Sequence, residues 1–76
     1  MRRVGEVVRV AGGVAVARCP GVDHPEIGTD VVDESLEGVG RVVDVFGPVD
    51  RPYLAVSPEE DRHLAGLVGA VLYARS

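Results

Sequence analysis

The chain has 76 residues, enough for a single domain of marginal stability, and its single cysteine, Cys19, excludes a disulfide framework. Its net charge of −4, from 12 acidic residues and 8 arginines with no lysine, argues against nucleic-acid binding as the main function, because such binding relies on cationic side chains. Glu6 interrupts the first apolar run and no stretch approaches the roughly 20 apolar residues of a membrane span, so we expect a cytoplasmic protein with neither a signal peptide nor a membrane anchor.

The first half of the chain is predicted to form three short strands. The 17 valines of the whole chain favour strands, because β-branched side chains fit a pleated surface and lose rotamer freedom in helices. Strands are predicted over 3–10 and 14–18, joined by a tight hairpin at Ala11-Gly12-Gly13. A loop with two prolines follows over 19–28, then a third strand over 29–33 and a turn over 34–37.

The second half is predicted to add strands over 38–46, 53–57 and 69–74. Pro58 ends the fifth strand, because proline has no N–H to donate to a neighbour. Residues 59–64 are predicted to form one helical turn, with Ser57 as N-cap and Glu60 at the spacing of a capping box. Six short strands without a linker predict one domain over 1–76, of the all-β class. A small closed six-stranded β-barrel is favoured because closure removes exposed sheet edges.

Side chains of the predicted strand over 38–46 alternate between two faces of the sheet. Alternation places Val43 and Val45 on one face and Val42 and Phe46 on the other. We predict that the face with Val43 belongs to the core, which leaves Val42 and Phe46 directed outward. Outward apolar side chains beside a loop are candidates for a partner-binding surface.

Few residues are placed for chemistry. Cys19, Asp23 and His24 in one loop, with His63 further on, could hold zinc, but their spacing matches no paired ligand motif. None of the serines lies in a nucleophile motif. Four carboxylates near one predicted turn are expected to form a solvated acidic face: Asp30, Asp33, Glu34 and Glu37. We therefore predict no catalytic residue, no metal and no cofactor, and expect that the chain is not an enzyme.

The most distinctive segment joins the fourth and fifth strands and reads Phe46-Gly47-Pro48-Val49-Asp50-Arg51-Pro52-Tyr53. Two prolines stiffen it, and one interpretation is a rigid turn whose aromatic residues plug the mouth of the barrel. The other is a pre-ordered loop that binds a partner with Val49 at its tip, because a rigid loop loses little entropy on binding. The partner-binding residues would then be Val42, Phe46, Gly47, Pro48, Val49, Pro52 and Tyr53.

The same segment resembles the hallmark of the GAR-type subunit of H/ACA ribonucleoproteins. Residues 40–49 read GRVVDVFGPV and residues 52–56 read PYLAV, which is similar to the family pattern IGKVxDVFGPVxxPYVxV. Residues 27–33, IGTDVVD, resemble the strand that precedes this pattern, and residues 66–73, GLVGAVLY, resemble the closing strand. The resemblance covers residues 27–74, whereas residues 1–26 match only loosely.

The resemblance implies a barrel of the translation-factor type and a role in RNA-guided pseudouridylation of rRNA, and so in ribosome biogenesis. In that complex a separate pseudouridine synthase subunit holds the catalytic aspartate. The GAR-type subunit, a monomer before assembly, binds the synthase and influences a mobile loop that grips substrate RNA. Contact with guide and substrate RNA is expected to be indirect only, because the chain carries none of the Gly/Arg-rich arms of eukaryotic members.

An acidic surface without lysine is typical of proteins from a high-salt cytoplasm, where salt screens the self-repulsion of the acidic groups. The chain therefore resembles a haloarchaeal member of the family. A GC-rich genome would also explain the missing lysine, but not the excess of acid. Two other functions stay open. One is the related H/ACA assembly factor, which shares the barrel core and docking surface but usually has long flanking regions. The other is a stand-alone translation-type barrel that binds RNA or the ribosome.

Overall fold

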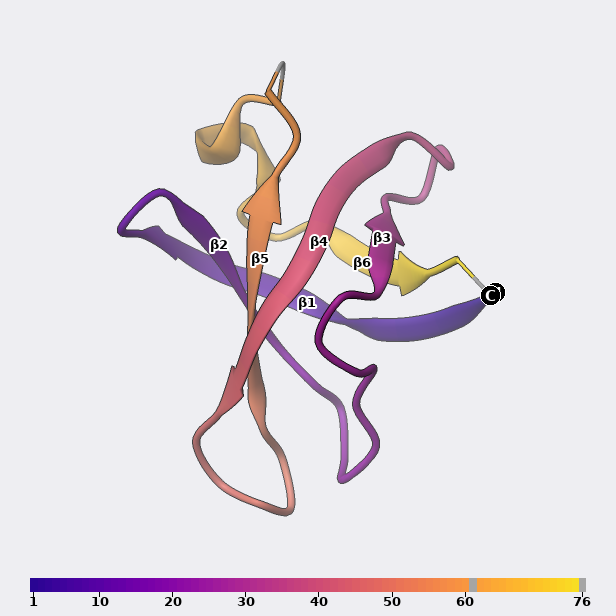
Figure 1. Cartoon of the computed structure of the whole chain (residues 1–76), viewed down its shortest axis with the longest axis vertical. Helices are drawn as coiled ribbons and strands as arrows, with labels where there is room; N and C mark the ends of the chain where they lie inside the picture. Colours follow the sequence, from indigo (N-terminus) through magenta and orange to yellow (C-terminus); the bar gives the residue numbers. More distant parts are fainter. Residues whose placement is uncertain (61, 76) are drawn as a thin grey trace.

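A computed structural model describes residues 1–60 and 62–75 of the chain (Figure 1). The elements in chain order are β1 Arg2–Ala11, β2 Val14–Arg18, β3 Asp30–Val32, β4 Gly38–Phe46, β5 Tyr53–Pro58, the 3-10 helix η1 Leu64–Leu67 and β6 Val71–Ala74. The six predicted strands are confirmed, with ends that differ by no more than two residues.

The six strands close into a barrel with the order β1-β2-β5-β4-β3-β6, and every neighbouring pair is antiparallel. The predicted fold class is therefore confirmed. The hairpin between β1 and β2 is also as predicted, since Ala11 pairs with Val14. The short strands β3 and β6 pair with each other and join β4 to β1, which completes the ring (Figure 1). Closure pairs the strand edges that would otherwise offer unpaired backbone groups to other chains.

The core is built almost entirely from valine, leucine and alanine side chains inside this ring. Every second residue of β2 and β5 points into the core. These residues are Ala15, Ala17, Leu54 and Val56, and all four are buried. Such small and medium side chains fit the narrow interior of a six-stranded barrel at native packing density. The core cluster consists of Val4, Val7, Ala15, Ala17, Cys19, Val31, Val39, Val42, Leu54, Val56, Leu67, Leu72 and Ala74.

The predicted orientation of β4 is wrong at two positions, because a β-bulge interrupts its alternation. The register between β4 and β5 shifts between Val42 and Asp44, so Val43 is an extra residue on β4. The extra residue breaks the alternation, so Val43 and Asp44 both lie on the exposed side of the sheet. Val42 is fully buried in the core, whereas Val43 is 44% exposed. Phe46 does point outward, as predicted, at 42% exposed.

The helical turn predicted over 59–64 is also wrong. Ser57 pairs with Arg41 in the sheet, and the Glu59 N–H donates to the Val39 carbonyl, so the backbone stays extended where the N-cap was expected. The helical turn comes later, as η1, because there Leu67 reaches the core. Residue 61 of the predicted turn lies outside the described residues. No helix in the described ranges has the length and apolar character to cross a membrane.

Candidate functional site

The loop between β4 and β5 is held in one conformation by contacts at its base. The Cys19 N–H donates to the Pro52 carbonyl at 2.9 Å, and Arg51 Nε donates to the Cys19 carbonyl at 3.2 Å. The Arg51 N–H also donates to the Pro48 carbonyl at 3.3 Å, which closes a turn within the loop. With two prolines fixing their own φ angles, these bonds leave the loop little conformational freedom to lose on binding.

Gly47 is required by this geometry for two separate reasons. Its φ of +87° lies in the left-handed region, which a residue with a side chain enters only at a cost. A Cβ atom added at Gly47 would also lie 2.8 Å from Cδ2 of Tyr53. The close approach lets the Tyr53 ring cover the start of the loop.

Val49 stands at the free end of the loop. Its side chain is 90% exposed, the largest exposure among the large apolar residues of the described chain. In Figure 1 the loop extends beyond the barrel at the lower ends of β4 and β5, at the opposite end from η1. The sequence predicted Val49 at the tip of this loop, and its high exposure agrees with that prediction.

Three side chains form a ladder across the strands at the base of the loop. Phe46 and Tyr53 are register partners on β4 and β5, and their rings stack with centroids 5.7 Å apart and planes inclined by 20°. Arg18 is the partner of Tyr53 on β2, and its Cζ atom lies 4.9 Å from the centroid of the Tyr53 ring. Stacking and cation–π attraction together fix the orientation of Tyr53.

A continuous apolar surface extends from this ladder across the outside of the barrel, and we call it the outer apolar face. Val16 and Ala55 are register partners that alternation directs outward, yet only 6% and 8% of them is exposed. They lie beneath larger neighbours, and a shallow groove of about 370 Å³ runs between Val8, Arg9, Val16, Phe46 and Tyr53. The outer apolar face consists of Val8, Phe46 and Tyr53, with Val16 and Ala55 packed beneath them.

The structure therefore separates the sequence-predicted partner-binding residues into two groups. Phe46, Gly47, Pro48 and Val49 are exposed and lie together, and Tyr53 is half-buried beside them. Two others are buried: Val42 in the core and Pro52 at the base of the loop, so neither side chain is available to a partner.

Sequence reasoning missed Val8, which is 44% exposed and lines the groove from β1. The register between β1 and β2 shifts between Val7 and Arg9, so Val8 is the extra residue of a bulge. The only available signal was the doublet Val7-Val8, which breaks the alternation expected of a strand with one buried face.

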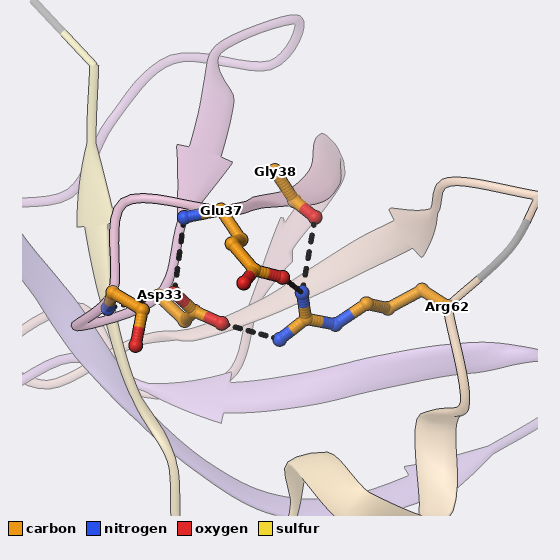
Figure 2. Close-up of polar contacts among 5 residues, drawn as sticks. Asp33, Glu37, Gly38 and Arg62 are labelled. Atoms are coloured by element: carbon orange, nitrogen blue, oxygen red, sulfur yellow. Dashed lines mark hydrogen bonds and ion pairs between the residues drawn. The ribbon is translucent and has the colours of Figure 1, made fainter.

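The acidic cluster near the β3–β4 turn is organised by Arg62, which follows β5 (Figure 2). Its guanidinium donates to Asp33 and to the Gly38 carbonyl and lies 3.6 Å from a Glu37 carboxylate oxygen. Asp33 also accepts the N–H groups of Ser35 and Glu37. The hydrogen bond from Arg62, with these backbone bonds, holds the pKa of Asp33 below its usual value. These contacts brace the turn and leave Asp33 ionised rather than able to exchange protons near neutral pH.

The residues considered for zinc do not come together. Cys19 is buried in the core, and burial raises the pKa of its thiol, although the charge of Arg2 opposes this. His24 is exposed, and its Nδ1 lies 3.0 Å from the Pro25 carbonyl. Across residues 1–60 and 62–75, no three His, Cys, Asp or Glu side chains are arranged to hold a metal ion.

The candidate site is thus a rigid loop with an exposed apolar tip beside the outer apolar face. No protein-family model matches the chain, and no curated protein matches it.

Proposed function

We propose that this chain is a non-catalytic accessory subunit of an H/ACA ribonucleoprotein, which binds the pseudouridine synthase subunit and assists loading and turnover of substrate RNA. The observation that carries the proposal is the loop from Phe46 to Tyr53. Its residues resemble the hallmark of GAR-type subunits, and the same loop is held by hydrogen bonds at its base with the side chains of Phe46 and Val49 exposed.

The geometry of the loop suits recognition of a protein partner. Hot spots in protein interfaces are enriched in tryptophan, tyrosine and arginine, lie in well-packed settings and are surrounded by contacts that exclude water. Val49 provides an exposed anchor, and Phe46 and Tyr53 provide a stacked aromatic surface next to the groove. The interface that we propose consists of Val49 with the outer apolar face, and Val42 is no longer part of it.

The polar groups of the chain support an accessory role. Asp33 is occupied by Arg62, Asp30 lies 3.5 Å from Arg41, and the Cys19 thiol is buried with its pKa raised. Each of these groups has a structural role or is kept from solvent. Catalysis would then belong to the synthase subunit.

The test is binding and reconstitution with the synthase subunit of the same organism. We expect a one-to-one complex by size-exclusion chromatography and calorimetric titration. Adding the barrel to synthase, guide RNA and the remaining core proteins should raise the multiple-turnover rate more than the single-turnover rate. An effect on assembly with no effect on turnover would favour the assembly-factor alternative. Failure to bind the synthase, with co-sedimentation on ribosomal subunits instead, would favour the translation-type barrel.

A further inference from the structure

A second surface, away from the outer apolar face, gathers cationic groups around the loop that follows β2. A hollow of about 330 Å³ is lined by Arg2 and Arg3 of β1 and by residues 20–25, which include His24. Ala74 is the register partner of Arg2, and this pairing brings Arg75 to the same edge of the barrel. The one carboxylate in the lining is Asp23. We call Arg2, Arg3, His24 and Arg75 the basic edge.

The arginines of the basic edge differ from the two arginines of the described residues that form ion pairs. Arg41 and Arg62 lie within 4 Å of carboxylates, at Asp30 and at Asp33 and Glu37. Between carboxylates of the described residues and Arg2, Arg3 or Arg75, no such ion pair is formed. Arg2 and Arg3 are both exposed, so the N–H donors of their guanidinium groups face water and can bind a ligand.

From this arrangement we infer that the basic edge binds the ribose-phosphate backbone of single-stranded RNA. Arginine presents paired N–H donors that match the oxygens of a phosphate, and adjacent arginines can engage successive phosphates of one strand. Pro20 and Val22 give the hollow apolar surface against which ribose can lie between phosphates. Nδ1 of His24 must donate to the Pro25 carbonyl, so Nε2 of the neutral ring is an acceptor and can accept from a ribose hydroxyl.

The basic edge also lies next to the loop proposed to bind the synthase. Cys19 opens the segment that lines the hollow, and it is bonded to Arg51 and Pro52 of the β4–β5 loop. This step rests on the proposed function: RNA held by a synthase docked at Val49 would be tethered to the molecule that carries the basic edge. Such tethering raises the effective concentration of a contact that is weak on its own.

The contact is weak on its own for an electrostatic reason. Three arginines engage about three phosphates, which gives log K against log salt a slope of about −2 for a single strand. The rest of the chain repels RNA, since the net charge is −4. We expect dissociation constants on the order of 10⁻⁴ M or weaker, so a gel shift at low micromolar protein should show no complex.

The test is an NMR titration of the isolated ¹⁵N-labelled chain with a ten-nucleotide oligouridylate, at the lowest KCl concentration that keeps the barrel folded. We expect shift changes centred on residues 2–3, 20–25 and 74–75. The double variant Arg2→Gln/Arg3→Gln should bind about tenfold more weakly and lose most of the salt slope. The matched double variant Arg9→Gln/Arg41→Gln, which removes the same charge elsewhere, should bind like the wild type. The amide spectra of both variants report whether they remain folded.

Two further titrations identify the ligand chemistry. A ten-residue oligoglutamate that binds as well as the RNA would overturn the inference in favour of an acidic protein partner. Inorganic phosphate that saturates the same residues at equal phosphate concentration would overturn it in favour of a single-anion site. Shift changes confined to the outer apolar face, or equal binding by the two double variants, would also contradict it. Because the titration uses the isolated chain, its outcome is independent of whether the chain binds the synthase.

Discussion

Val42 and Val43 are adjacent valines of β4 with opposite environments. Val42 is fully buried in the core, and Val43 is 44% exposed beside the bulge. Burial of a valine side chain is worth about 0.8 kcal/mol per methylene, and its deletion also leaves a cavity. The pair therefore gives a direct test of the bulge, because simple alternation from the chain sequence assigns the core position to Val43 instead.

We predict that Val42→Ala lowers the free energy of unfolding by roughly 2 kcal/mol, whereas Val43→Ala lowers it by less than about 0.5 kcal/mol. Urea denaturation followed by circular dichroism measures both values. The reverse order of the two effects would mean that β4 pairs with β5 without the bulge, and that the outer apolar face is wrongly assigned.

At the scale of the elements, strand positions could be predicted because glycine and proline punctuate the valine-rich runs at short intervals. The bulges could not be predicted, because they arise from pairing with a neighbouring strand rather than from the local sequence. The loop Phe46–Tyr53 and the exposure of Val49 could be anticipated from the two prolines and flanking aromatics. The groove could not, because Val8 and Arg9 reach it from a strand more than thirty residues away in the chain.

The contact of Arg62 with the β3–β4 turn is the main polar link between elements. We predict that Arg62→Gln destabilises the barrel by about 1–2 kcal/mol near neutral pH, since hydrogen bonds to a charged group are lost from a site where both side chains are mostly buried. Arg75→Gln, at an exposed arginine, is the control and should be nearly neutral. Equal free energies of unfolding for wild type and Arg62→Gln would show that the contact between Arg62 and the β3–β4 turn does not stabilise the barrel.

The contact between Arg62 and Asp33 makes the stability of the barrel depend on pH, and the lowered pKa of Asp33 sets the direction of that dependence. Its pKa in the folded chain is lowered, chiefly by Arg62, below an unfolded value of about 3.9. The stabilisation is therefore fully present above the unfolded pKa and is lost as the pH falls through the folded pKa. The stability difference between wild type and Arg62→Gln should be constant from about pH 5 to 7 and shrink below about pH 4. A difference that persists at the acid end would assign the effect to packing of the Arg62 stem.

At the scale of the whole molecule, the balance of charge sets the conditions in which the barrel is stable. Acidic groups outnumber arginines, so the folded chain repels itself until salt screens the repulsion. A domain of 76 residues has only a small free energy of unfolding, so this charge repulsion can lower its stability noticeably.

We predict that the melting temperature rises by about 5 °C or more between 0.05 M and 2 M KCl, which for a domain of this size corresponds to roughly 1 kcal/mol. A triple variant, Glu26→Gln/Glu34→Gln/Glu60→Gln, removes three exposed carboxylates that form no ion pair with the described residues and should show a clearly smaller rise. An equal rise in both chains would point to general salt strengthening of apolar burial. A flat curve in the wild type would remove the argument for a high-salt cytoplasm.

The most direct test of the proposed function is a titration of Val49→Glu against the pseudouridine synthase subunit, with circular dichroism to confirm the fold. Burying a charge at the centre of the interface should cost roughly 2 kcal/mol or more, so we predict at least about a 30-fold loss of affinity. Val68→Glu is the matched control: Val68 is 54% exposed and follows η1, at the end of the barrel opposite the loop (Figure 1), and its variant should bind like the wild type. A folded Val49→Glu chain with unchanged affinity would contradict the account and leave the Phe46–Tyr53 loop as a structural plug of the barrel.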